Sequence, residues 1–163
     1  MTARTAWTAG NGVGLTWTTV INSADMASMT NGQSVLSSVS DIANGTNLDQ
    51  FMDVSLEWTI SSSTIAAGAN ATFWIFELDE GGSVYGDNSL TAGNAASVTP
   101  GLFPAFVMPF RAASSQTSLY GYASAIIIPP GSFRLAVQNN SGFSLSSGTQ
   151  TVKYRTYNIQ LNN

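Results

Sequence analysis

The stretch that decides the fold runs from residue 53 to residue 60 and reads DVSLEWTI. Apolar side chains occupy every second position in it, at Val54, Leu56, Trp58 and Ile60. A period of two is typical of a β-strand with one buried face and one face in water. A helix would scatter the same apolar residues around its circumference. We therefore expect a strand here, with Asp53 and Glu57 as solubilising side chains on its wet face.

Further runs of this kind lie on both sides of the first. Residues 71–78, ATFWIFEL, are apolar at nearly every position, which is typical of a central strand of a sandwich. Residues 101–110, GLFPAFVMPF, contain two prolines, and proline within a strand favours an edge or bulged position. The other expected strands cover residues 15–21, 34–42, 118–128 and 151–161; a short helix is the alternative for 34–42.

A corner is expected within residues 126–142, IIIPPGSFRLAVQNNSG. Pro129 and Pro130 lack N–H groups and cannot continue a strand ladder, and Gly131 lets the chain reverse. Short strands separated by Gly, Pro, Asn and Ser indicate an all-β fold. At 163 residues, an antiparallel, jelly-roll-like sandwich of about eight strands fits. We expect one domain over residues 15–163, preceded by an extended arm of residues 1–14.

Composition excludes several kinds of chemistry. The chain has no Cys and no His, so thiolate chemistry and the usual neutral-pH proton shuttle are missing. Only 9% of residues are charged, and the net charge is −4, which disfavours a nucleic-acid partner. No apolar run is long enough to predict a membrane span. No motif indicates a cofactor, and we expect a protein that is not an enzyme.

Candidate sites are few. The segment 77–88, ELDEGGSVYGDN, offers Asp79, Glu80 and Asp87 as possible Ca²⁺ ligands, although a solvated hairpin loop is the simpler interpretation. A glycosidase pair of Asp53 and Glu57 is conceivable but improbable. Aromatic residues that could form a sugar platform or a protein interface, if they are not core, are Trp7, Trp17, Tyr85, Tyr120, Tyr122, Tyr154 and Tyr157.

Two regions are expected at subunit interfaces. The arm carries Arg4 and Trp7, and a Trp side chain gains from burial against a partner. The apolar segment 101–110 carries Phe106 and Met108, which could cover an interface as well as a core.

Three segments together resemble a family of tailed-bacteriophage virion proteins. They are NGTNLDQFMDVSLEW at 44–58, FWIFELDEGGSVYGD at 73–87 and IIIPPGSFRLAVQNNSGFSLSSGTQTVKYRTYN at 126–158. The family often has Asp-Gly followed by Tyr in the second segment, where this chain has Asp79 followed by Glu80-Gly81-Gly82. The order of the three segments is more specific than any one of them.

The resemblance implies a non-enzymatic, jelly-roll-like structural protein of the virion, assembled in the bacterial host cytoplasm. On that basis we expect a cement or decoration protein that binds the major capsid protein on the head, as a homotrimer. The alternative is a carbohydrate-binding module of the tail or baseplate that attaches to the host.

Overall fold

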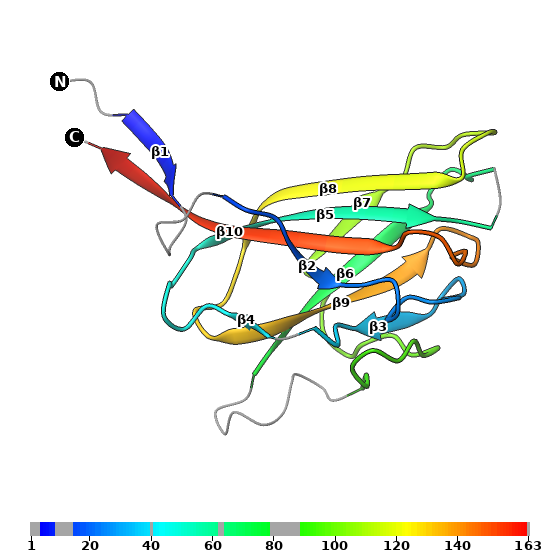
Figure 1. Ribbon diagram of the computed structural model, residues 1–163, viewed down its shortest axis with the longest axis horizontal. Coiled ribbons are helices and arrows are strands. Elements are labelled where there is room, and N and C mark those ends of the chain that lie inside the picture. The colour runs from blue at the N-terminus through cyan, green and yellow to red at the C-terminus, as the bar shows by residue number, and fades with distance from the viewer. Residues whose placement is uncertain (1–3, 9–14, 40, 62–63, 79–88, 163) are drawn as a thin grey trace.

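The structure is a computed structural model of residues 1–163. It describes residues 4–8, 15–39, 41–61, 64–78 and 89–162, with residues 4–8 and 160–162 described by their backbone alone. Within these ranges the chain forms strands and turns and no helix. Two antiparallel sheets face each other, which confirms the expected all-β sandwich (Figure 1).

The first sheet, called the β5 sheet below, has the order β2-β10-β5-β8, and β1 pairs with the far end of β10. The second, called the β6 sheet, has the order β3-β9-β6-β7, and β4 pairs with β9. The strand bounds in the β5 sheet are β1 Arg4–Thr8, β2 Thr18–Ile21, β5 Phe51–Thr59, β8 Ser118–Ile127 and β10 Thr151–Asn162. Those in the β6 sheet are β3 Ser34–Leu36, β4 Ile42–Ala43, β6 Asn70–Glu77, β7 Phe106–Pro109 and β9 Ser132–Asn140.

The strand order is that of a jelly roll. Setting β1 and β4 aside and numbering the other eight strands along the chain, the two sheets have the orders 1-8-3-6 and 2-7-4-5. Each sheet therefore alternates strands from the two ends of the chain, as two interlocked Greek keys require.

The core lies between the sheets and is built by the period-two pattern. From β5 it receives Met52, Val54, Leu56 and Trp58, all buried. The β6 sheet contributes Phe73, Leu135 and Val137. The expected corner is present as well, because β8 ends at Ile127 and β9 begins at Ser132, with Pro129–Gly131 between them.

Two expectations about local structure differ from what is observed. The expected strand at 34–42 is split, because β3 ends at Leu36 and β4 begins at Ile42. Part of the expected arm is a strand, because Arg4–Thr8 pairs with Asn158–Asn162 of β10. The alternation within residues 4–8 is too short to distinguish such a strand from an irregular tail.

Candidate interaction surface

The outer face of the β5 sheet points away from the core and carries an unusual mixture of side chains. Alternation along the strands places the polar and aromatic members of three strands on this face, and the segment before β2 adds a tryptophan. The residues that we call the outer face are Trp17, Phe51, Asp53, Ser55, Glu57, Tyr120, Tyr122, Ile127, Lys153, Arg155 and Tyr157.

Asp53 is the centre of this face. Its Oδ1 accepts hydrogen bonds from the Tyr157 hydroxyl at 3.0 Å and from the backbone N–H of Ala125 at 3.1 Å. Its Oδ2 accepts from the Tyr122 hydroxyl at 2.9 Å and from Arg155 Nε at 2.9 Å, and Arg155 Nη2 lies 2.8 Å away. Although it lies on the outer face, Asp53 is only 1% exposed. The expectation that it is an ordinary solubilising carboxylate was wrong.

A bulge in β8 makes room for this arrangement. The register between β5 and β8 shifts between Met52 and Val54, so that two residues of β8 lie opposite Asp53. One of them, Ala125, has a φ of 55°, a conformation that residues other than glycine rarely adopt. The bulge turns the Ala125 N–H from the strand ladder to the carboxylate.

The hydrogen bonds set the protonation states of the group. Burial by itself would raise the pKa of Asp53, but the hydrogen bonds from Arg155, Tyr122, Ala125 and Tyr157 outweigh burial and hold that pKa below its usual value. Burial and the neighbouring carboxylate raise the pKa of Tyr157 to about 12. Near neutral pH the centre is therefore an ionised carboxylate held by one cation and two neutral phenols.

An aromatic layer surrounds the charged group. The Trp17 ring lies 4.8 Å from the Arg155 guanidinium and 6.0 Å, edge to face, from the Tyr122 ring. The Phe51 ring stacks on Tyr157 at 5.9 Å. These contacts fix Arg155 in place, so the aromatic rings above the sheet rest on a rigid polar base.

Large apolar and aromatic side chains remain in water on the same face. Ile127 is 78% exposed, Tyr120 64% and Tyr122 55%. Ile159 of β10 is also exposed, and it pairs in register with the backbone of Trp7 in β1. The exposed apolar character therefore continues from the outer face onto the β1–β10 pair.

The other aromatic and interface candidates from the sequence differ in where the structure places them. Tyr154 packs against the core, and the side chains of Trp7 and Arg4, with the whole of Tyr85, lie outside the described residues. Phe106 is half-buried and stacks on Phe73 with ring centres 4.6 Å apart. Met108, for which the sequence allowed either an interface or a core position, is buried in the core of this chain, where β7 faces β8. The Met108 side chain fills the space that Gly121 leaves open. A Cβ at position 121 would lie 2.8 Å from the Met108 sulfur.

A second exposed apolar group lies next to β7 and was not expected from the sequence. Phe103 is 97% exposed, and Val98, Leu102 and Val107 are also exposed. The loop that carries Phe103 is anchored, because the Trp74 indole N–H donates to the Leu102 carbonyl at 3.0 Å. No sequence pattern distinguishes an exposed Phe103 from the buried phenylalanines of the same segment.

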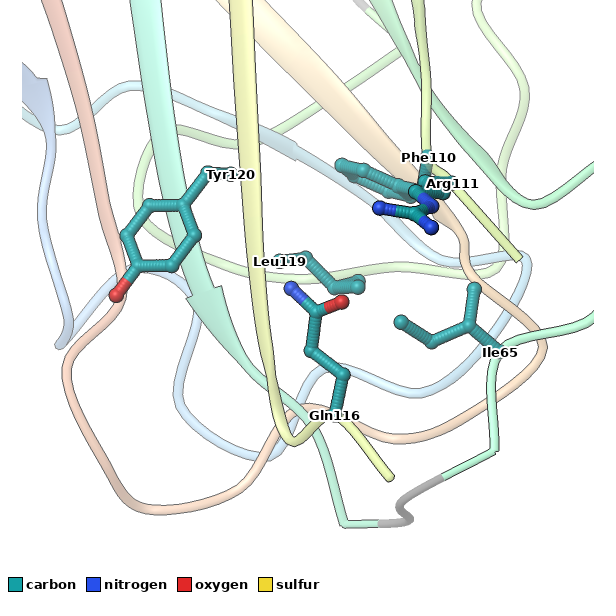
Figure 2. Close-up of a pocket in the computed structure, with 6 residues that line it drawn as sticks. All are labelled: Ile65, Phe110, Arg111, Gln116, Leu119 and Tyr120. Carbon is teal, nitrogen blue, oxygen red and sulfur yellow. The ribbon is translucent and has the colours of Figure 1, made fainter. Parts of the chain in front are cut away.

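A small depression opens at one end of the sandwich (Figure 2). Its volume is about 170 Å³, and its lining residues are Ile65, Phe110, Arg111, Gln116, Leu119 and Tyr120. Figure 2 shows the Arg111 guanidinium and the Gln116 amide beside the apolar side chains, with the Tyr120 ring turned away. The volume is below the range of roughly 300–1,000 Å³ that is usual for small-molecule sites. It could hold at most a single side chain of a partner.

The acidic candidates from the sequence are only partly within the described residues. These residues contain no cluster of three or more His, Cys, Asp or Glu side chains suited to hold a metal ion, and Asp79, Glu80 and Asp87 lie outside them. In the conceivable Asp53–Glu57 pair, both oxygens of Asp53 accept hydrogen bonds beneath the aromatic layer. The described part of the chain also has no helix long and apolar enough to cross a membrane.

Comparison of the chain with protein-family models, with curated proteins and with solved structures finds no match.

Proposed function

We propose that the chain is a non-enzymatic structural protein of a bacteriophage virion, a cement or decoration protein that binds the major capsid protein and stabilises the head. The observation that carries the proposal is the uncovered outer face of the β5 sheet. Ile127, Tyr120 and Tyr122 are exposed on this face, large exposed apolar groups often mark interaction sites, and Tyr, Trp and Arg are enriched at interfaces.

The rigidity of this face supports a role in assembly. Asp53 fixes Tyr122, Tyr157 and Arg155 from below, so little side-chain freedom remains to be lost when a partner covers them. The jelly-roll order of the strands also supports the proposal, because this architecture is common among capsid proteins.

The location in the virion tests the proposal. An antibody against the purified protein should label the heads in immunogold electron microscopy of virions of the phage that encodes it. Phage particles from an unrelated phage serve as the control. Label on tails would favour the alternative function, and virions without label would exclude a virion protein of either kind.

Self-association is the second part of the proposal. Light scattering of the purified protein should give a trimer, with three times the 17.1 kDa mass of the chain. A monomer at micromolar concentration would contradict a constitutive trimer.

A carbohydrate-binding module of the tail or baseplate remains the second candidate. The exposed rings of Tyr120 and Tyr122 favour it, since they lie close to Glu57 and Ser55 on a flat surface where a sugar ring could stack. A glycan array separates the two functions. Binding that is lost in both Y120A and Y122A would favour the module, and binding to no glycan would favour the capsid protein.

A further inference from the structure

The two ends of the described chain form a two-stranded extension of the β5 sheet. Residues Thr151–Tyr157 of β10 pair with β5, and β5 begins at Phe51, opposite Tyr157. Beyond this point Asn158–Asn162 pair with β1 alone. Figure 1 shows β1 and the end of β10 projecting together from one end of the sandwich. We call these ten residues, 4–8 and 158–162, the terminal ribbon.

The terminal ribbon is tied to the rest of the domain at its base, where Asn158 accepts a hydrogen bond from the Gln50 N–H and donates one to Asp49. Within the described residues, β10 is the only strand that pairs with β1. A pair of strands without a third is marginally stable in water. β1 can therefore detach from β10 at a low cost in free energy, which opens the paired edge of β10.

The edges of the ribbon lack the features that usually protect an exposed strand. The overhang of β10 reads NIQLN, without a charge or a proline, and β1 reads RTAWT, with Arg4 as its only charge. Exposed edge strands generally carry Lys, Pro or other charges that prevent pairing with another chain. When β1 detaches, the end of β10 is an unprotected edge of this kind and a site for pairing with another β-strand.

A second copy of this chain is the partner that fits. The surface shown to accept β1 is Asn158–Asn162 of β10, with the register Arg4–Asn162, Ala6–Gln160 and Thr8–Asn158, and every copy carries it. Exchange between copies keeps all five residue pairs, so it costs no backbone pairing. The connector between Thr8 and Thr18 has nine residues and can span at most about 30 Å, which is enough to reach a neighbouring molecule.

We propose that β1 pairs with the end of β10 of a second copy, so that neighbouring subunits are joined by exchanged N-terminal strands. In this arrangement the backbone of Trp7 in one copy pairs in register with that of Ile159 in the next. This inference concerns contacts between copies and is independent of whether the protein sits on the head or the tail.

Engineered disulfides test the exchange, and the absence of native cysteine makes the readout clean. The double variant A6C/Q160C is purified, oxidised and run on a non-reducing gel. Exchanged strands give covalent dimers, trimers or larger species, whereas a strand paired within its own chain gives only monomer. Because strand pairs alternate between two geometries, of which disulfides prefer one, T5C/L161C is tested in parallel.

A mixture of two single variants gives the decisive test. A6C mixed with Q160C should form a heterodisulfide at least about ten-fold faster than A6C mixed with Y120C, because exchange raises the local concentration of the paired thiols. Mass spectrometry of the linked peptides identifies the bond. Only internal disulfides in both double variants, together with a mixture no faster than its control, would overturn the proposal. That outcome would leave the immunogold test of virion location unaffected.

Discussion

The outer faces of the two sheets differ in whether the chain itself covers them. On the β6 sheet the chain covers its own face, because the segment 89–102 folds over it. Leu90, Ala92 and Ala96 pack there in a small second core with Leu36, Trp74, Phe76 and Ala136. Backbone bridges from Ser34 to Ala96 and from Leu36 to Ala92 attach this cover to β3. On the β5 sheet no described segment provides such a cover, and aromatic rings lie in water above a buried carboxylate.

The difference separates stability from recognition. The covered face buries the large side chains of Trp74 and Phe76. Their burial therefore contributes to the free energy of unfolding of the isolated protomer. An uncovered face with comparable side chains gains that free energy only when a partner arrives. Substitutions on the two faces should therefore affect different measurements.

The largest effect is expected on the covered face. Trp74→Ala should lower the free energy of unfolding by about 3–5 kcal/mol, because it leaves a cavity beneath the segment 89–102 and removes the indole hydrogen bond to Leu102. Urea unfolding followed by circular dichroism measures the change. A loss below about 1 kcal/mol would be typical of an exposed position and would mean that the cover is not packed on the sheet.

Asp53 should give the next largest effect. Asp53→Asn should cost about 2–3 kcal/mol at neutral pH, less than for a fully buried ion pair because Arg155 is partly exposed. Glu57→Gln, two positions along the same face, is the matched control and should change stability by less than about 0.5 kcal/mol. Equal effects of the two substitutions would show that Asp53 does not organise the face.

The same residue predicts how stability depends on pH. The folded pKa of Asp53 lies below its value of 3.8 in the unfolded chain, so the folded state binds a proton less readily. Its stabilising contribution is therefore present above pH 3.8 and is lost as the pH falls through the folded pKa. Chemical unfolding from pH 6 down to pH 2 should show a shallower decline for Asp53→Asn than for the wild type. Parallel declines would refute this assignment.

Substitutions on the uncovered face of the β5 sheet should weaken binding to a partner and hardly change the free energy of unfolding. Tyr120→Ala and Ile127→Ala should each change the free energy of unfolding by less than about 0.5 kcal/mol. If the proposed role on the head is right, the same variants should bind poorly to heads that lack the protein, as measured by co-sedimentation. Phe103→Ala is the comparison at the other exposed apolar group. If it alone weakens binding, the contact lies beside β7 and not on the outer face.

The smallest effect is spectroscopic. Tyr157 has a pKa of about 12, raised above the ordinary tyrosine value of 10.0 by burial and by its hydrogen bond to Asp53. In an absorbance titration at alkaline pH, one tyrosine should ionise after the others, and Tyr157→Phe should remove that late step. If the wild type and the variant titrate alike, the hydroxyl of Tyr157 is not held by Asp53.

The sequence was sufficient for the architecture because local periodicity carries it. The alternation in 53–60 and the Pro-Pro-Gly corner at 129–131 predict strands and turns without knowledge of their neighbours. The buried state of Asp53 could not be predicted in this way. Its partners Tyr122 and Tyr157 are 69 and 104 residues away, and the register shift that aims Ala125 at it arises only when β5 meets β8.

The same limit explains why the different exposures of two residues in one segment could not be predicted. Met108 and Phe103 lie in one apolar segment, and composition gives no reason to separate them. Met108 is buried because Gly121 leaves space for its side chain between the sheets. Phe103 is exposed because the hydrogen bond from Trp74 to Leu102 anchors its loop outside the sheets. A close approach of strands far apart in sequence is a tertiary property that a segment taken alone does not contain.

The pairing of Arg4 with Asn162 has a consequence for anything attached to the protein. The two ends of the described chain lie together at the tip of the projecting strands. A peptide fused to either end would therefore extend from that tip. Such a fusion would be displayed at the end of the sandwich and would leave the aromatic face accessible. The fused peptide would be carried at one copy per chain, whichever terminus is used.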